Sequence, residues 1–359
     1  MRKKKILFTS YDLNIGGIEK ALINLLNNMN YDKYDITLIL EKKEGVLLDK
    51  LNKNVNIVEY KVSNNKNILI RKIINFTKRI RWIIKNYHKY DFSCCYATYS
   101  YPCNTLSFYA SKNNSIYVHS NYKYIYDEIN LKHFFDTRRI DRFKKIIFVS
   151  NEARNDLIKF YPFIKDKSLV INNLVDYKEI IKLSKEKINI NKSLDKLFVF
   201  VGRLEENSKR ISKLIKVFQE LKNMELWIIG DGLDKKIYEN MIKTSSNIKM
   251  LGSKINPYPY MKLADYIILT SDYEGFPVVY NESIVLNKKI ITTIDVSDDY
   301  ISIKDRFGYI IDKDIKNMKK DIENIMINDK LEIEDIDFSK LNKKRIDMLE
   351  SIIEDNYEI

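Results

Sequence analysis

The sequence predicts an α/β protein made of two domains, each a doubly wound parallel sheet covered by helices. The chain has 359 residues, which is long for one domain and typical of two domains of about 150–180 residues each. Short apolar runs rich in β-branched and aromatic residues alternate with segments of helical periodicity along the whole chain. Such an alternation of strands and helices is typical of parallel sheets with helices on both faces.

The first series of strands occupies the amino-terminal half. We predict seven strands there, at residues 5–10, 35–40, 55–60, 92–97, 115–118, 145–150 and 168–171. Helical periodicity separates most of them, most clearly at residues 18–29, 68–87 and 151–160. We therefore assign residues 1–175 to an N-terminal domain.

The second series repeats the scheme. We predict six further strands, at residues 197–201, 225–229, 248–251, 266–270, 289–293 and 309–311. Residues 172–195 form the seam, residues 176–337 a C-terminal domain, and a last helix at about 338–359 is expected to pack back on the N-terminal domain. Ligands of such sheets bind beyond the carboxyl ends of the strands, so a cleft between the two domains is the expected site.

The charge of the chain is concentrated in its first half. Residues 1–176 carry 31 Lys and Arg against 17 Asp and Glu, a net charge of +14, whereas residues 177–359 sum to −1. This asymmetry favours an anionic partner for the first half, such as nucleic acid, anionic lipid or a phosphorylated substrate. The alternative, that lysine serves only solubility, explains the abundance of lysine but not its distribution.

Cysteine usage and hydropathy indicate the compartment. The three cysteines, Cys94, Cys95 and Cys103, are odd in number and close together, which does not suit a disulfide framework. The first apolar run, residues 6–8, is too short for a signal peptide, and no run approaches 18 apolar residues. We therefore predict a cytoplasmic protein.

The most basic stretch of the chain is residues 61–90, which contain nine Lys or Arg and no Asp or Glu. Apolar residues recur there at helical spacing: Leu69, Ile70, Ile73, Ile80, Ile83, Ile84 and Tyr87. A basic amphipathic helix of this kind is typical of a peripheral membrane surface. The alternative is that the apolar stripe packs on its own sheet and the lysines are merely solvated. A second group of cations supports the membrane interpretation: Arg138, Arg139, Arg142, Lys144 and Lys145.

Glycines are scarce and mark the ends of predicted strands. The chain has only 9, where average usage of about 7% would give roughly 25. Gly16 and Gly17 follow the first strand and open a helix, where backbone can approach an anion closely. Gly202 ends the first strand of the second series and is followed by Arg203 and, six residues later, Lys209. A guanidinium and an ammonium beside a helix start suit a diphosphate.

Two carboxylates belong to a neighbouring strand end. Glu274 follows the strand at 266–270, and Glu282 lies about two turns further, inside a helix that Pro277 opens. Carboxylates accept paired hydrogen bonds from vicinal hydroxyls, so two of them near one strand end suit a sugar and a ribose. Taken alone, each glutamate is more typical of a solvated surface position.

Because these residues follow one another in this order along the chain, the sequence resembles the retaining glycosyltransferases of family 4. The GT-B fold of that family consists of two Rossmann-like domains that face each other across a cleft. Glu274 and Glu282 match the E-x7-E motif of that family. Residues 170–176 resemble its V-I-P-N-G-V-D stretch, and His119 matches its histidine near the sugar. The sequence departs from the family pattern at Asn172, Leu174 and Ser283.

The resemblance implies a role for each matched residue. Arg203 and Lys209 would bind the donor diphosphate and stabilise the leaving group without a metal ion. Glu274 would hold hydroxyls of the donor sugar, Glu282 would hold the ribose, and His119 would act near the sugar; Glu274, His119, Arg203 and Lys209 are the expected catalytic residues. The other expected donor contacts are Gly16, Gly17, Gly275, Phe276, Pro277 and Val278, with Lys254 and Ile255 beside the nucleobase.

The activity implied is transfer of a sugar from a nucleotide-sugar, a UDP-sugar, to a glycan or lipid-linked acceptor with retention of anomeric configuration. Cell-surface polysaccharide or glycoconjugate biosynthesis, such as that of a capsule, is the implied context. No metal is expected, since the histidines His88, His119 and His133 are scattered and the three bunched cysteines offer no metal-site spacing. No cofactor and no nucleic acid are expected either. Two alternatives stay open: a GT-B relative with other chemistry, such as a sugar-nucleotide epimerase or a phosphorylase, and a non-catalytic basic subunit that binds membrane or nucleic acid.

Overall fold

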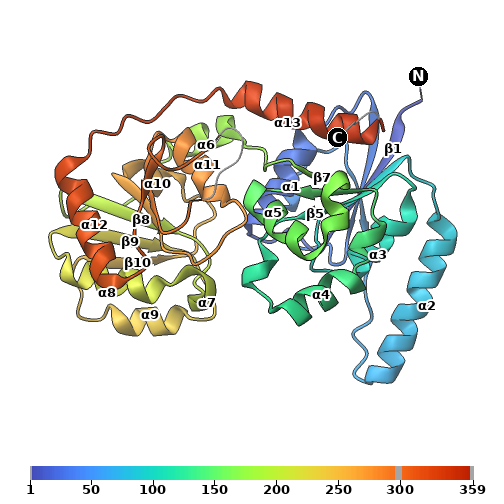
Figure 1. Cartoon of the computed structure of the whole chain (residues 1–359), viewed down its shortest axis with the longest axis horizontal. Helices are drawn as coiled ribbons and strands as arrows, with labels where there is room; N and C mark the ends of the chain where they lie inside the picture. Colours follow the sequence, from blue (N-terminus) through green and yellow to red (C-terminus); the bar gives the residue numbers. More distant parts are fainter. Residues whose placement is uncertain (1, 296–300, 356–359) are drawn as a thin grey trace. The chain divides into compact units, whose positions relative to one another are not determined.

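The structure is a computed structural model that describes residues 2–295 and 301–355 (Figure 1). The chain divides into two compact units: unit 1 comprises Met1–Leu174 with Ser339–Ile359, and unit 2 comprises Val175–Phe338. Each unit has its own parallel sheet with helices, which confirms the predicted α/β class with two doubly wound domains. None of the described helices is long and apolar enough to cross a membrane.

Unit 1 is built on a seven-stranded sheet with the order β3-β2-β1-β4-β5-β6-β7. Its strands are β1 (Lys4–Ser10), β2 (Tyr34–Leu40), β3 (Asn56–Glu59), β4 (Phe92–Cys95), β5 (Asn114–Val118), β6 (Lys145–Phe148) and β7 (Ser168–Val170). All seven lie where the apolar runs predict them. The order reverses between β1 and β4, and the carboxyl ends of strands at such a reversal are where ligands of doubly wound sheets bind.

Helices of unit 1 begin at residues whose side chains cap the first turn. Asn67, Ser100, Asp127 and Ser150 each accept a hydrogen bond from a backbone amide there. The helices are α1 (Gly17–Asn27), α2 (Ile68–Asn86), α3 (Tyr101–Ala110), α4 (Glu128–Thr137), α5 (Asn151–Phe160) and α13 (Phe338–Ile353), with short 3-10 turns η1 (Leu48–Lys50), η2 (Tyr122–Tyr124), η3 (Ile140–Arg142) and η4 (Pro162–Lys167). Most of α1 is buried against the sheet, whereas α2 has no buried residue.

Unit 1 also contains the last helix of the chain, α13. Its carboxyl end is tied to the sheet by ion pairs from Lys4 to Glu354 at 2.5 Å and from Lys144 to Asp355 at 2.6 Å. Arg345, in the middle of α13, is buried and donates a hydrogen bond of 2.8 Å to the carbonyl oxygen of Asn173. These contacts join segments at opposite ends of the chain within one unit.

Unit 2 has a six-stranded sheet with the order β10-β9-β8-β11-β12-β13. Its strands are β8 (Lys196–Val201), β9 (Met224–Ile229), β10 (Ile248–Gly252), β11 (Tyr266–Leu269), β12 (Lys289–Thr292) and β13 (Gly308–Ile310). Its helices are α6 (Tyr177–Leu183), α7 (Glu206–Lys209), α8 (Ile211–Glu220), α9 (Lys235–Met241), α10 (Tyr258–Leu263), α11 (Val278–Val285) and α12 (Ile315–Asn328). The six strands again lie where the sequence predicts them, and the order reverses between β8 and β11.

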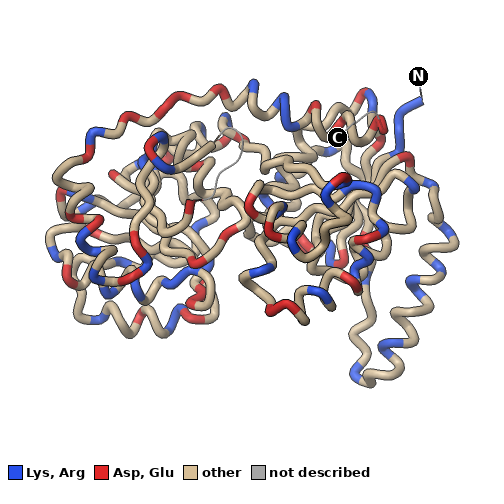
Figure 2. Tube along the Cα trace, viewed as in Figure 1, with Lys and Arg blue, Asp and Glu red and all other residues tan. Residues whose placement is uncertain are grey.

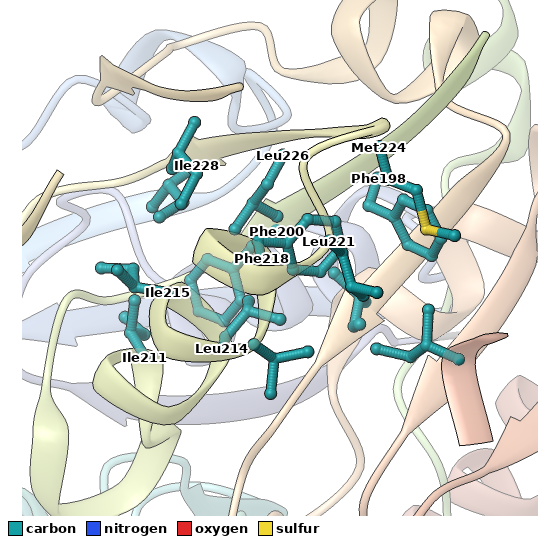
Figure 3. Packing of buried hydrophobic residues seen from close by; sticks show 14 of the residues in the cluster. Phe198, Phe200, Ile211, Leu214, Ile215, Phe218, Leu221, Met224, Leu226 and Ile228 are labelled. Atoms are coloured by element: carbon teal, nitrogen blue, oxygen red, sulfur yellow. The ribbon is translucent and has the colours of Figure 1, made fainter. Parts of the chain in front are cut away.

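The core of unit 2 explains why α8 is fixed on its sheet. Ile211, Leu214, Ile215 and Phe218 recur at the spacing of one helix face and are all fully buried (Figure 3). They pack against side chains of β8 and β9, including Phe198. Because α8 follows directly after α7, this packing also fixes the segment that carries Lys209, which ends α7.

Candidate functional site

The candidate residues of unit 2 lie at the carboxyl edge of its sheet, on both sides of the reversal in strand order. Arg203 follows β8, and Glu274 lies in the loop that follows β11. These two strands are parallel neighbours, with Tyr266 opposite Phe198, so the two loops emerge side by side. This is the position at which doubly wound sheets bind ligands.

Lys209 and Glu274 are brought together by the structure, although 65 residues separate them. The ammonium group of Lys209 forms an ion pair with Oε1 of Glu274. The hydroxyl of Ser271 donates to the same oxygen at 2.7 Å. Both charged side chains are mostly buried, with exposed fractions of 16% and 14%. A buried ammonium is costly without a counter-charge, so Glu274 stabilises Lys209 in its place.

The loop that carries Glu274 is bonded to α7 at three further points. The Thr270 hydroxyl donates to the carbonyl oxygen of Lys209 at 2.9 Å, and the Asp272 amide donates to the carbonyl oxygen of Ser208 at 2.8 Å. The Arg210 side chain forms an ion pair with Asp272. Arg210 has a left-handed backbone with φ of 50°, an unfavourable conformation for a residue other than glycine. The segments that hold Lys209 and Glu274 are therefore positioned together.

Arg203 differs from Lys209 in its exposure. Its side chain is 73% exposed, and its guanidinium lies 3.7 Å from a carboxylate oxygen of Glu205. The loop that carries it also depends on Gly230, which has φ of 155° and lies against the carbonyl oxygen of Gly202. A Cβ atom at Gly230 would be 1.9 Å from that oxygen, so only glycine fits. The structure thus presents Arg203 to solvent at the edge where Lys209 is enclosed.

Glu282 has a different hydrogen-bond partner from those of Glu274. It is buried inside α11, and the Tyr258 hydroxyl, from α10, donates to its Oε1 at 3.0 Å. Burial and the neighbouring Glu282 carboxylate raise the pKa of Tyr258, so its hydroxyl keeps its proton and can donate. Sequence reasoning did not single out Tyr258, Ser271 or Asp272, and no motif marks them.

The remaining predicted donor contacts surround the start of α11 and the end of β10. Gly275, Phe276 and Pro277 are buried and lead into α11, which begins at Val278 and has no side-chain cap within the described residues. A helix start carries backbone amides without helical partners, which can bind an anion. The other two predicted contacts lie in the loop after β10. Ile255 is 73% exposed, and the Lys254 ammonium lies 5.6 Å from the ring centre of Tyr260.

The predicted residues of unit 1 also lie at the carboxyl edge of their sheet. Gly16 and Gly17 follow β1 and open α1, and the carbonyl oxygen of Gly16 accepts the amide of Lys20. His119 follows β5, on the other side of the reversal between β1 and β4. The N-cap residue of α1 is Gly16, which has no side chain with which to cap the helix.

His119 is enclosed by aromatic rings. The Tyr117 ring stacks on it at a centre-to-centre distance of 5.1 Å, and the Tyr96 ring lies at 4.3 Å. The imidazole is only 8% exposed, and neither ring nitrogen meets hydrogen-bond geometry with a partner in the described part of the chain. Burial lowers the pKa of His119 to about 3, so the ring is neutral at pH 7. A neutral imidazole can donate through one nitrogen and accept through the other.

Within residues 2–295 and 301–355, no group of three or more His, Cys, Asp and Glu side chains is arranged to hold a metal ion. The three cysteines are free and buried, and burial raises the pKa of the Cys103 thiol. Among the candidate residues of unit 2, Arg203, Lys209 and Lys254 are cations, and the start of α11 adds backbone amides.

Two family models match consecutive parts of the chain. Residues 15–179 match the model described as Glycosyltransferase Family 4, and residues 181–340 match the model described as Glycosyl transferases group 1. The two models together span both units from the Gly16 loop to the start of α13.

Three known proteins illustrate the similarity. Over 182 residues, the chain is 28% identical to the N-acetylgalactosamine-N,N'-diacetylbacillosaminyl-diphospho-undecaprenol 4-alpha-N-acetylgalactosaminyltransferase of Campylobacter jejuni, covering 49% of each chain. Over 146 residues, it is 30% identical to the capsular polysaccharide biosynthesis glycosyltransferase CapH of Staphylococcus aureus, covering 37% of this chain and 38% of that one. The matches thus span half of these relatives or less. The crystal structure of Anabaena HepE in complex with UDP and glucose superimposes with a TM-score of 0.76 at 15% identity, over 97% of this chain and 100% of that one.

Proposed function

The chain belongs to the family 4 glycosyltransferases, with the GT-B fold, and from this premise we propose that it transfers a sugar from a UDP-sugar to a glycan or lipid-linked acceptor. The observation that carries the proposal is the enclosed pair of Lys209 and Glu274 at the carboxyl edge of unit 2. That pair places a cation and a carboxylate together, the two groups that a sugar diphosphate needs. The reaction proceeds with retention of anomeric configuration, as the resemblance implies.

Lys209 is proposed to stabilise the leaving diphosphate. Glycosyl transfer separates a positively charged sugar ring from a departing diphosphate, and fixed charges lower the barrier when they are aimed at that developing charge. Lys209 is held by the packing of α8 and by the Thr270 hydrogen bond, so little reorganisation is needed during the reaction. Arg203 is exposed, and we assign it to initial capture of the diphosphate at the same edge.

The two glutamates are proposed to hold different parts of the donor. Glu274 keeps one carboxylate oxygen on Lys209 and Ser271, and its other oxygen is assigned to hydroxyls of the sugar. Glu282 is oriented by the Tyr258 hydroxyl and is assigned to the ribose. The start of α11 supplies backbone amides to phosphate oxygens, and Lys254 and Ile255 flank the base.

His119 is proposed to contact the reacting sugar from unit 1 as a neutral group. Both ring nitrogens are buried and neither meets hydrogen-bond geometry with a partner among the described residues, so a contact to a sugar hydroxyl requires the side chains around the ring to move when the donor binds. Since burial lowers the pKa of His119 to about 3, it serves as a hydrogen-bonding group and not as a permanent cation. Gly16 and Gly17 contribute backbone amides at the same edge of unit 1.

The proposed acceptor is a growing cell-surface glycan, either free or linked to a lipid. The name of the Campylobacter relative describes an acceptor on undecaprenol diphosphate, and the Staphylococcus relative is a capsular polysaccharide enzyme. We therefore propose a cytoplasmic enzyme that works at the membrane without crossing it. A metal ion is not required, because Lys209 and Arg203 supply the positive charge at the diphosphate.

A donor panel tests this function. The purified chain is incubated with UDP-, GDP- and ADP-sugars, and thermal shift and nucleoside-diphosphate release are measured with and without EDTA. We expect one UDP-sugar to stabilise the chain and to release UDP, at a rate that EDTA leaves unchanged within about twofold. Interconversion of a UDP-sugar without release of UDP would instead identify an epimerase. Loss of release in EDTA would show that a metal is needed.

A further inference from the structure

Helix α2 exposes an apolar row that no other part of the described chain covers. Leu69, Ile73, Phe76, Ile80 and Ile84 are 71%, 62%, 54%, 39% and 74% exposed. Their spacing of three or four residues places them along one side of the helix. We call these five side chains the apolar row of α2. Exposed apolar surface of this extent on one element marks an interaction site.

The opposite side of α2 holds the helix on unit 1. Trp82 packs against a buried cluster that includes Leu106 of α3, and the Arg79 guanidinium lies 5.1 Å from the ring centre of Tyr101. The Asn75 side chain accepts the amide of Ser63 at 2.7 Å. At 3.6 residues per turn, these residues lie about 100° to 160° around the helix from the middle of the apolar row. The helix is therefore fixed on one side while the row faces outward.

Cations flank the apolar row, and no acidic residue interrupts them. Residues 61–90 contain nine Lys or Arg and no Asp or Glu, and Figure 2 shows this basic stretch along α2. At 3.6 residues per turn, Lys72 lies on one side of the row and Arg81 on the other, with Lys85, Lys78 and Arg71 further round the helix beyond Arg81. An apolar strip bordered by cations matches the boundary between acyl chains and anionic headgroups.

The second group of cations does not add to this surface as the sequence predicted. Arg138 donates to the carbonyl oxygens of Thr98 and Tyr99 at 2.8 and 2.9 Å. Arg139 donates to the Tyr109 hydroxyl, and Lys144 pairs with Asp355. Three of its five members are thus bonded within unit 1, so the bilayer surface proposed below is confined to α2.

We propose that α2 lies in the surface of an anionic bilayer, with the apolar row among the acyl chains and the flanking cations on lipid phosphates. A second copy of this chain is a poorer occupant, because a symmetric contact through α2 would bring two sets of cations together. Nucleic acid would leave the apolar row exposed to water. This inference rests on the proposed function and extends it, because it names the surface through which the enzyme would reach a lipid-linked acceptor.

Vesicle flotation of the full chain tests the inference. Vesicles of phosphatidylcholine with about 30% phosphatidylglycerol are compared with pure phosphatidylcholine at low and high salt. We expect binding to the anionic vesicles that weakens at least about tenfold at high salt, because cations at such a surface are screened. Binding that is equal on both vesicle types, or absent from both, would overturn the proposal.

Three variants separate the row from the cations. The triple change Ile73→Ser, Phe76→Ser and Ile84→Ser removes exposed apolar side chains, and Lys78→Gln, Arg81→Gln and Lys85→Gln removes three cations. Each is expected to weaken binding at least about tenfold. The matched control removes the same charge from exposed positions of unit 2 through Lys222→Gln, Lys236→Gln and Lys243→Gln. An equal loss in this control would mean that net charge alone drives binding.

Donor binding distinguishes the two proposals. Thermal shift with the UDP-sugar is measured on all variants, and we expect it to match the unmodified chain because α2 carries none of the proposed donor contacts. Vesicle binding without any donor response would contradict the proposed function and leave the bilayer surface standing. A donor response without vesicle binding would contradict only the bilayer surface. Self-association that the serine variant abolishes would assign the apolar row to a second copy.

Discussion

Units 1 and 2 both bring candidate residues to the carboxyl edge of a parallel sheet, but the candidate side chains differ in charge and in their neighbours. In unit 2 the charged groups come in pairs, as Lys209 with Glu274 and Arg210 with Asp272. In unit 1 the candidate side chain is a neutral His119 between aromatic rings, with a pKa lowered to about 3 by burial.

The difference shows that net charge does not locate the anion site. Unit 1 contains the half of the chain with a net charge of +14, yet those charges are prominent on the exposed helix α2 and not around His119. The second half is almost neutral, and its enclosed lysine has a carboxylate beside it. A cation that is mostly buried needs such a partner, so a donor site that holds one is expected to be locally balanced.

The largest effect is expected from removal of the enclosed cation. Lys209→Ala should lower kcat by at least about 100-fold, because it removes a preorganised charge beside the leaving diphosphate. Arg203→Ala should lower kcat/KM by only about tenfold, because that side chain is 73% exposed and its charge is screened by solvent. Steady-state release of UDP measures both, with circular dichroism as the control for folding. A larger loss in the Arg203 variant would reverse the roles.

Much of the fold could be predicted from the sequence because each strand is a local signal. All thirteen strands coincide with short β-branched and aromatic runs, including β9 (Met224–Ile229), and their ends differ by a few residues at most. Helix α2 was also predicted from its periodicity. Periodicity does not say what covers an apolar face, however, and the alternative that this stripe packs on its own sheet is wrong, since α2 has no buried residue.

The second prediction concerns the neutral site of unit 1. His119 has a folded pKa of about 3 and an ordinary unfolded pKa of about 6.5, so below pH 6.5 only the unfolded state binds the proton. The contribution of the neutral His119 to the free energy of unfolding is therefore fully present above pH 6.5 and is lost as the pH falls. The free energy of unfolding should decrease by about 2 kcal/mol between pH 7 and pH 5. The variant His119→Asn should lack this part of the pH dependence.

Denaturant unfolding at the two pH values measures this loss. In a Trp227→Phe background, Trp82 is the remaining tryptophan and reports on unit 1. The control is Lys209→Ala in the same background, which alters unit 2 and should keep the pH dependence of unit 1. If His119→Asn and the unmodified chain lose the same free energy on acidification, the imidazole is not held neutral by burial.

The site could be predicted only where the sequence carries a local pattern. The spacing of Glu274 and Glu282 and the strand-end glycines are such patterns, and they place the predicted site at the carboxyl edge of the sheet. The partners of these residues come from distant segments. Lys209 meets Glu274 across 65 residues, and Tyr258 meets Glu282 across 24, in contacts that depend on the order of the strands. No window of the sequence shows that order.

The third prediction separates the two glutamates of unit 2. Glu282→Gln should raise the KM for the donor about tenfold with kcat nearly unchanged, because contacts to the unreactive ribose are equal in ground and transition states. Glu274→Gln should mainly lower kcat, because in its proposed role the carboxylate contacts the sugar on which positive charge develops. Calorimetry with UDP alone should show weaker binding only to the Glu282 variant.

Tyr258→Phe, which removes the hydroxyl that orients Glu282, should give a donor KM between those of the unmodified chain and the Glu282 variant. Equal losses of UDP affinity in both glutamate variants would mean that their roles are not distinct.

The smallest effect is expected at the ion pair of Arg210 and Asp272 in unit 2. The attraction between these two side chains stabilises the loop, whereas the left-handed backbone of Arg210 destabilises it. Asp272→Asn removes the partner of Arg210, and because both side chains are about a third exposed, the pair contributes at most about 1 kcal/mol. The melting temperature of unit 2 should therefore fall by up to about 4 °C. Arg210→Gly loses the same pair but also relieves the left-handed backbone with φ of 50°, which costs a residue other than glycine about 1 kcal/mol. Its melting temperature should stay within about 1 °C of the unmodified chain.

Differential scanning calorimetry compares the two variants, with Arg210→Lys as the control that keeps both the charge and the backbone strain. A fall in Arg210→Gly as large as that in Asp272→Asn would show that the backbone at Arg210 is not strained.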